Sequence, residues 1–250
     1  MNLVVAAALG AVPSIRLNNG VEMPMISAGT WQYDPTTATQ VVKTALSVGI
    51  NHIDTANDYH NQEGVGAGLK GVNRSSYFLT TKVPPQSTEA TAFEKTTKDL
   101  EDNLDQLGLS YVDLVLVHFP PPGNTRHCSA MQRQWAAMEA FYAAGKARAI
   151  GVSNYCPSSL ECILPNATVT PAVNQCEYHV GMSADPDGIK MYCDGKGIVL
   201  QAYSPLGDGT SDLITGPLVT GSSLLAHVVH TSTSPPLSFR FTSTPDIRAF

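Results

Sequence analysis

From residue 25 onward, short apolar runs alternate with longer stretches in which apolar residues recur at helical spacing. The apolar runs are nearly continuous, which is typical of strands buried on both faces of a parallel sheet. Helical patterns between such runs predict repeated βα units. The predicted strands are Met25–Gly29, His52–Thr55, Tyr77–Val83, Val112–His118, Ala147–Val152, Ala172–Tyr178 and Ile198–Tyr203, and the helical patterns include Ala38–Val48, Thr91–Leu107 and Ala130–Ala144.

An antiparallel hairpin is predicted ahead of the first βα unit. Ser14–Pro24 consists of two short alternating runs on either side of Asn18-Asn19-Gly20. Asn-Gly between alternating runs is a strong local signal for a tight hairpin turn. The chain therefore begins its ordered part with two short strands that do not belong to the parallel sheet.

A glycine-rich loop would distinguish an open doubly wound sheet from a closed barrel. The open sheet should carry G-x-G-x-x-G directly after its first strand, at the start of a helix. Here that strand is followed by Gly29-Thr30-Trp31-Gln32, and the stretch Gly64–Gly68 starts well past the second predicted strand. We interpret Gly64–Gly68 as the start of a glycine-rich helix rather than a dinucleotide cradle. The sequence therefore favours an α/β fold of the (β/α)8 TIM barrel class.

The strand count and the end of the chain indicate an incomplete barrel. Seven strands can be placed, whereas a complete barrel of this class has eight. Residues Thr220–Phe250 are rich in Ser, Thr and Pro and show no sustained helical or strand periodicity. We predict a barrel domain over residues 13–221 and an atypical, disordered tail over residues 222–250. A barrel without its closing strand exposes two sheet edges, which is a liability for stability.

Composition narrows the classes of partner. The 250 residues suit one domain, and a hydrophobic content of 43% is enough for a large core. The net charge of −6, with no cluster of Lys or Arg, argues against nucleic acid as the main partner. No stretch approaches the roughly 20 apolar residues of a membrane span. We therefore expect a protein that acts on small molecules and neither binds nucleic acid nor enters a membrane.

The cysteines and the first residues bear on the compartment. The cysteines are odd in number, widely spaced and without a C-x-x-C motif, so we interpret all five as reduced thiols in a cytoplasmic protein. Residues 1–12, MNLVVAAALGAV, leave open a secreted location, because they resemble the apolar part of a short signal with a cleavage site near Ala11. No Lys or Arg precedes this run, which argues against a signal. The five positions are Cys128, Cys156, Cys162, Cys176 and Cys193.

Four polar side chains lie at or just after the ends of three predicted strands. Asp54 and Tyr59 follow the second strand, Lys82 ends the third and His118 ends the fourth. Barrel enzymes keep their chemistry at these carboxyl-terminal ends. A buried carboxylate needs a cation or hydrogen bonds, so an ion pair between Asp54 and Lys82 is expected, although each residue alone is more often an ordinary strand end.

A carboxylate, an ammonium, a phenol and an imidazole suffice for acid-assisted reduction of a carbonyl group. A free phenol has a pKa near 10 and is a poor acid at neutral pH, but a neighbouring ammonium favours its ionised form. His118 can donate a hydrogen bond to a carbonyl oxygen and orient it, whereas a lone histidine at such a position is usually a satisfied core residue. The set of Asp54, Tyr59, Lys82 and His118 therefore predicts a catalytic site.

A metal-dependent barrel hydrolase would use some of the same residues differently. His52 and Asp54 project from one face of a strand, and His118 and His179 also lie at strand ends. Barrel metallohydrolases place their ligands in this way. This alternative gives Lys82 no role and lacks a tight cluster of ligands, so we expect no metal.

Six segments of the chain together resemble the aldo-keto reductase family. The likeness covers about Ser14 to Gly207. The family has a (β/α)8 barrel and binds NADPH without a Rossmann fold, so the resemblance implies NADPH-dependent reduction of an aldehyde or ketone. It also implies that Tyr59 is the general acid, Lys82 its activator, Asp54 the partner of Lys82, and His118 the residue that orients the carbonyl. The segments are HIDTANDYHNQEGVGAGL, LTTKVPP, LGLSYVDLVLVHFP, GKARAIGVSNY, PAVNQCEYH and VLQAYSPLG.

The same resemblance implies a set of cofactor and substrate positions. Ser153, Asn154 and Gln175 match residues that hydrogen-bond the nicotinamide amide, and Tyr203 matches the aromatic side chain that stacks on its ring. An aromatic face and an amide clamp fix a ring for directed transfer. Trp31 and Phe119 would form an apolar wall around the substrate, beside Tyr59 and His118. The full cofactor set is Gly29, Thr30, Trp31, Ser153, Asn154, Gln175, Tyr203, Ser204 and Leu206.

The departures from the family pattern lie at the end of the chain. The family continues past YSPLG with another βα unit, a Lys-Ser pair and an Arg that hold the adenosine 2′-phosphate, and a loop that closes the substrate pocket. None of these is found in Asp208–Phe250. A catalytically inactive truncated barrel, or a binding module that keeps only the barrel mouth, is therefore the alternative function. In either case we expect a monomer.

Overall fold

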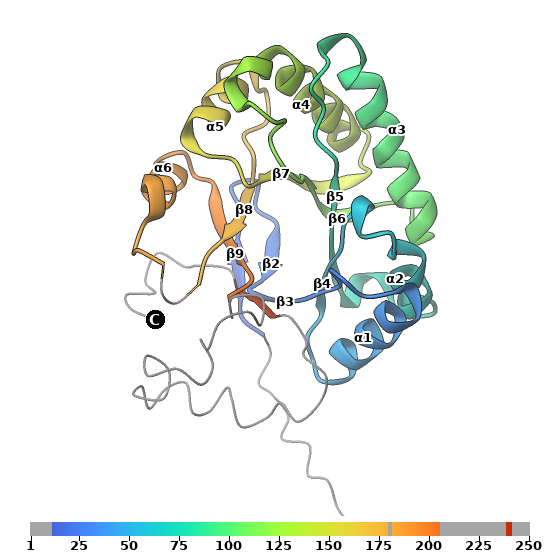
Figure 1. Ribbon diagram of the computed structural model, residues 1–250. Coiled ribbons are helices and arrows are strands. Elements are labelled where there is room, and N and C mark those ends of the chain that lie inside the picture. The colour runs from blue at the N-terminus through green and yellow to red at the C-terminus, as the bar shows by residue number, and fades with distance from the viewer. Residues whose placement is uncertain (1–11, 180–181, 206–238, 242–250) are drawn as a thin grey trace, which may run out of the picture.

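Seven parallel strands curl around a common interior in the computed structural model, which describes residues 12–179, 182–205 and 239–241 (Figure 1). They are hydrogen-bonded in chain order, each to the next, as short right-handed βα connections require. The predicted seven-stranded incomplete barrel is therefore confirmed. The strands are β3 (Ile26–Gly29), β4 (His52–Asp54), β5 (Phe78–Val83), β6 (Val112–Val117), β7 (Ala147–Ser153), β8 (Val173–Glu177) and β9 (Val199–Tyr203).

Helices follow the strands and cover the outside of the sheet (Figure 1). Helix α1 begins after Asp34, whose carboxylate accepts hydrogen bonds from the backbone N–H of Thr36 and Thr37 and so caps the first turn. Helix α3 ends at Gly108, whose φ of 67° is the left-handed conformation that glycine adopts at low cost. The helices are α1 (Pro35–Ser47), α2 (Gln62–Leu69), α3 (Glu89–Leu107), α4 (Cys128–Ala143), α5 (Pro157–Ile163) and α6 (Ile189–Gly195). Within the described part of the chain, no helix is long and apolar enough to cross a membrane.

The glycines of α2 allow close packing of helices. A Cβ atom placed on Gly64 would lie 2.1 Å from the carbonyl oxygen of Pro35 in α1, and one on Gly66 would lie 2.5 Å from that of Leu107 in α3. The interpretation of Gly64–Gly68 as part of a helix is confirmed, since these residues lie within α2. The stretch is glycine-rich because two neighbouring helices leave no room for side chains.

Replacing Gly64 by alanine should destabilise the fold. The new methyl group would collide with backbone atoms of α1, and overpacking of this kind typically costs about 1–3 kcal/mol. Equilibrium unfolding in urea measures the effect. Gly195→Ala is the matched control, because a Cβ there meets nothing within 4 Å and the helix gains a better helix former. Equal stability of the two variants would contradict this account of α2.

The predicted N-terminal hairpin is confirmed and covers the amino-terminal end of the barrel. Strands β1 (Ser14–Arg16) and β2 (Glu22–Pro24) pair antiparallel. Leu17 and Met23 are buried against the interior side chains Phe78, Leu114 and Leu116. The hairpin therefore closes this end of the barrel with apolar side chains, and the opposite end remains for chemistry.

A short strand from the C-terminal part of the chain lies at the open side of the sheet. Strand β10 (Phe239–Phe241) pairs antiparallel with β3, with Arg240 opposite Ser27, and also contacts β9. The Ser/Thr/Pro-rich composition of this part of the chain carries no periodicity and predicts only irregular structure. The rest of the predicted tail, and all but the last residue of the predicted leader over residues 1–12, lie outside the described residues, so the domain boundaries stay predictions.

The cysteines differ from the expectation of five reduced thiols. Cys128, at the start of α4, and Cys162, in α5, form a disulfide, with Cα atoms 4.9 Å apart. The interpretation was wrong for this pair, because α4 packs against α5 and brings together two cysteines 34 positions apart in sequence. Cys156, Cys176 and Cys193 take no part in this disulfide.

Candidate active site

A buried ion pair between two neighbouring strands forms the centre of the site. Asp54 ends β4, and Lys82 extends from the same face of β5, two residues beyond the partner of Asp54 in the sheet register. Lys82 Nζ lies 2.6 Å from Asp54 Oδ1, and both side chains are fully buried. The ammonium also donates to the carbonyl oxygen of Thr55 (2.8 Å) and to the phenol oxygen of Tyr59 (3.2 Å). These three oxygens match the three N–H donors of an ammonium group, so the predicted trio is assembled.

Tyr59 is held over the barrel mouth by a short 3-10 helix, Asn57–Tyr59, which directly follows the β4 end. The Lys82 ammonium lies 4.8 Å from the centre of the phenol ring as well as near its oxygen. His60, immediately after Tyr59, adopts a left-handed φ of 54° and ends the 3-10 helix. The local turn therefore presents the phenol toward the ion pair.

Buried amide side chains, which were not among the predicted site residues, connect the Tyr59 segment with β5 from the side of the sheet that α3 covers. Asn103 of α3 accepts hydrogen bonds from Asn57 (2.8 Å) and Gln62 (2.7 Å) and donates to the carbonyl oxygen of Lys82 (3.1 Å). One amide thus ties the Tyr59 segment to the Lys82 strand. The available signal was Asn103 itself, a polar residue on the apolar face of a helix, beside Leu104.

His118 follows β6 and lies beside Tyr59, with the ring centroids 5.6 Å apart. Its Nδ1 atom is 2.9 Å from Oδ1 of Asp58, and its other side stacks on Phe119. Burial lowers the pKa of His118 and the Lys82 charge adds to this; the hydrogen bond to Asp58 opposes both without cancelling them. The imidazole is therefore neutral at neutral pH.

The predicted nicotinamide-binding residues belong to the same hydrogen-bond network. Gln175 of β8 donates from Nε2 to Asp54 Oδ2 (2.7 Å), and its backbone carbonyl accepts from the Ser153 hydroxyl (2.7 Å). Asn154, at a left-handed φ of 63°, donates to Ser153 Oγ (3.0 Å), while Tyr203 donates to Asn154 Oδ1 (2.8 Å). The network is therefore continuous from β4 to β9.

The predicted loop after β3 is anchored to the same end of the barrel. The backbone N–H of Thr30 donates to the carbonyl oxygen of Asp54 (3.0 Å), and the Asn61 amide donates to the carbonyl oxygens of Thr30 and Tyr33. Gly29 ends β3, and Trp31 is 44% exposed beside it. Ser204 follows β9 with a left-handed φ of 49°, whereas Leu206 lies outside the described residues.

The residues considered for a metal site do not converge. The ring of His52 lies deeper in the barrel, with Nδ1 2.9 Å from the Pro24 carbonyl oxygen and Nε2 2.8 Å from Thr80 Oγ1. His179 Nε2 lies 3.6 Å from Glu177 Oε1. His179 follows β8, whereas His118 follows β6. Within the described ranges, no three His, Cys, Asp or Glu side chains are placed to hold a metal ion.

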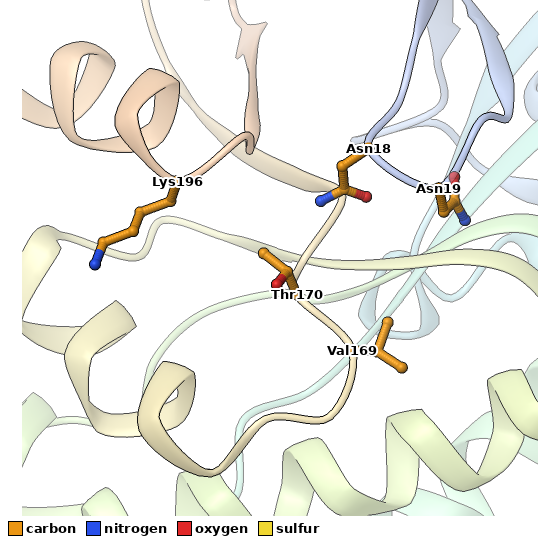
Figure 2. A pocket seen from close by; sticks show the side chains of 5 residues that line it. All are labelled: Asn18, Asn19, Val169, Thr170 and Lys196. Carbon is orange, nitrogen blue, oxygen red and sulfur yellow. The ribbon is translucent and has the colours of Figure 1, made fainter.

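A shallow pocket lies at the other end of the barrel (Figure 2). It is lined by residues of the hairpin turn and by residues that precede β8 and β9, at the amino-terminal strand ends. The Asn18 and Asn19 amides already donate to the carbonyl oxygens of Pro171 and Arg148, and Lys196 points away from them (Figure 2). This pocket is therefore the seam between hairpin and barrel, remote from the polar network. Its lining residues are Asn18, Asn19, Val169, Thr170 and Lys196.

Comparisons with known proteins agree with this architecture. Residues 24–213 match the profile of the aldo/keto reductase family. Glyoxal reductase of Bacillus subtilis is 41% identical over 199 residues, which cover 78% of this chain and 68% of that protein. The crystal structure of an aldo/keto reductase from Brucella melitensis superposes with a TM-score of 0.76 at 32% identity, over 88% of this chain and 83% of the other.

A Bombyx mori aldo-keto reductase, solved in complex with NADP, gives a TM-score of 0.71 at 30% identity, over 89% of this chain and 77% of that chain. The sequence profile, the curated relatives and the solved structures thus agree over most of the described residues. This chain belongs to the aldo/keto reductase family, and its barrel is that of an oxidoreductase.

Proposed function

We propose that this chain reduces the carbonyl group of a small aldehyde or ketone to an alcohol, with NADPH as the reductant and Tyr59 as the proton donor. The observation that carries the proposal is the position of the Lys82 ammonium, which is fully buried and donates to both Asp54 and the Tyr59 oxygen. A buried cation that touches a phenol at a barrel mouth suits proton donation better than structural support alone.

The residues at the mouth divide the work of the reaction between them. NADPH, when bound, supplies the hydride that adds to the carbonyl carbon. Tyr59 donates its phenol proton to the carbonyl oxygen, so that the product is a neutral alcohol. The Lys82 ammonium, 3.2 Å away, stabilises the phenolate that this step leaves behind. Asp54 holds the ammonium in place and balances its charge in the buried site.

The residues between β7 and β9 fit a nicotinamide group. Ser153, Asn154 and Gln175 offer hydroxyl and amide groups at neighbouring strand ends, which suit a planar carboxamide with one donor and one acceptor side. Tyr203 ends β9, and its hydroxyl donates to Asn154 Oδ1, so it offers an aromatic face beside these amide groups. The NADP complex of the Bombyx mori relative supports the same cofactor for this chain.

The substrate would lie between the catalytic residues and two exposed apolar rings. Trp31 is 44% exposed and Phe119 is 43% exposed, and they follow β3 and β6 at the same end of the barrel as Tyr59. Large apolar side chains exposed beside a polar site are typical of a binding surface. These rings would exclude water from the reacting carbonyl and leave His118 to contact its polar substituents.

Titration with NADPH, followed by addition of an aldehyde, tests the proposal. Saturable quenching of protein fluorescence by NADPH, together with NADPH oxidation that depends on the aldehyde, is the expected result. The matched control repeats the assay without aldehyde. Absence of both binding and oxidation would contradict the proposal and would favour the inactive truncated barrel.

A further inference from the structure

The orientation of the Asn103 amide is fixed by its hydrogen-bond partners. Asn103 belongs to α3, which packs against α2 and β5 on the same side of the barrel (Figure 1). Its amide nitrogen donates to the backbone carbonyl oxygen of Lys82 (3.1 Å), a group that can only accept. Its oxygen therefore faces the other way, where it accepts from the side-chain amides of Asn57 (2.8 Å) and Gln62 (2.7 Å).

Two of these partners flank Tyr59 in the chain, and the third is Lys82 itself. Asn57 is the first residue of the 3-10 helix that ends at Tyr59, and Gln62 is the first residue of α2. Gln62 Oε1 also accepts from the hydroxyl of Thr81 (2.5 Å), the residue before Lys82 in β5. The segment that carries the phenol is therefore tied, on both sides of Tyr59, to the strand that carries the ammonium.

The contact between phenol and ammonium is a long hydrogen bond. Lys82 Nζ lies 3.2 Å from the Tyr59 oxygen, at the far end of the usual range. The backbone N–H of Tyr59 donates to the carbonyl oxygen of Ala56, also at 3.2 Å, and short 3-10 turns have poorer hydrogen-bond geometry than α-helices. A displacement of roughly half an ångström would take the phenol out of reach of the ammonium. The contact therefore depends on how firmly the two segments are held together.

Burial makes the links of Asn103 hard to replace. Asn103 and Gln62 are each 1% exposed, and a buried polar group that loses its partner keeps its desolvation cost. Asn57 is only partly buried. Without Asn103, its amide would satisfy itself by turning toward solvent, and the start of the 3-10 helix would move with it. Loss of one amide on α3 would therefore be felt at Tyr59.

We propose that Asn103 is a positioning residue of the reaction, which holds the Tyr59 phenol within hydrogen-bond distance of the Lys82 ammonium. It acts through these two residues, from the side of the sheet that α3 covers. Its loss should therefore slow proton donation and leave NADPH binding unchanged, because the proposed nicotinamide residues lie between β7 and β9. The expected effect on turnover rests on the proposed function, whereas the expected effect on the position of Tyr59 rests on the hydrogen bonds alone.

The division between kcat and cofactor affinity tests the proposal. In Asn103→Ala, kcat for an aldehyde should fall about 10- to 100-fold, the usual consequence of a small misplacement of a reacting group. The dissociation constant of NADPH, measured by fluorescence titration, should stay unchanged. Asn57→Ala breaks the same link from its partly exposed end and should also lower kcat. The double variant should be no slower than the slower single variant, because both changes remove one link. Losses that multiply in the double variant would overturn the proposal.

Gln134 of α4 provides the matched control. It is a buried amide of the same kind, which donates to the carbonyl oxygen of Pro84 (2.9 Å) and accepts from the backbone N–H of Gln86 (3.1 Å). These bonds tie the chain after β5 to a helix and reach neither Tyr59 nor Lys82. Gln134→Ala should lower the free energy of unfolding in urea and leave kcat unchanged. An equal loss of kcat in Gln134→Ala and Asn103→Ala, or no loss in Asn103→Ala, would overturn the proposal.

The position of Tyr59 can also be followed without turnover. In protein labelled with fluorotyrosine, the fluorine NMR signal of Tyr59 is the one that is lost in Tyr59→Phe. This signal should shift in Asn103→Ala and stay in place in Gln134→Ala. A signal that does not move in Asn103→Ala would overturn the proposal. If the unaltered protein reduces no aldehyde, the proposed function fails, while the fluorine signal still decides whether Asn103 positions the ring.

Discussion

Tyr59→Phe is expected to lower carbonyl reduction by about 100- to 10,000-fold, the usual contribution of a positioned proton donor. The substitution removes only the hydroxyl group that accepts from Lys82. The ring that lies against His118 and over the Lys82 ammonium is retained. The loss should therefore appear in kcat, while NADPH binding, measured by fluorescence titration, stays unchanged.

Tyr142→Phe is the matched control for this prediction. Tyr142 is a partly buried tyrosine on the outer helix α4, far from the strand ends that carry the site. The variant removes the same hydroxyl group and should keep full activity. Undiminished turnover by Tyr59→Phe would show that the proton comes from another group.

Lys82→Met is expected to destabilise the protein by about 3–5 kcal/mol, because it leaves the buried Asp54 carboxylate without its paired cation. Methionine roughly preserves the length and apolar stem of the side chain, so the effect isolates the charge. The ammonium also holds the carbonyl oxygen of Thr55, which loses this donor. Equilibrium unfolding in urea, followed by circular dichroism, measures the change.

The double variant Asp54→Asn with Lys82→Met separates folding from catalysis. A neutral amide removes the buried charge, so most of the lost stability should return, as commonly happens when both members of a buried pair are replaced. Activity should not return, because no ammonium is left to stabilise the phenolate of Tyr59. If the double variant were as unstable as Lys82→Met alone, charge burial would not be the cause.

Much of the barrel could be predicted from the sequence because its strands are buried on both faces. Runs such as Leu114–Val117 are continuous in apolar character and end sharply at a polar residue, here His118. The same pattern made Asp54 and Lys82 recognisable as candidate site residues, because a charged side chain at the end of a buried run needs a partner. Local pattern and site chemistry therefore pointed to the same strand ends.

The features that the sequence did not reveal depend on packing between distant segments. Asn103 meets Asn57 and Gln62 only after α3 has packed against the β4–α2 connection. The Cys128–Cys162 disulfide depends in the same way on the contact of α4 with α5. Strand β10 adds to a sheet edge through backbone hydrogen bonds, which leave no trace in composition.

The hydrogen bond from Gln175 to Asp54 spans 121 positions of the chain. Closing so long a loop costs entropy that only later contacts repay, so such pairs form late in folding. The carboxylate at the centre of the site therefore reaches its final environment only after β8 has joined the sheet. During refolding, helical and strand signals should recover before the site is competent, and a nascent chain that ends before β8 would hold Asp54 and Lys82 without this support.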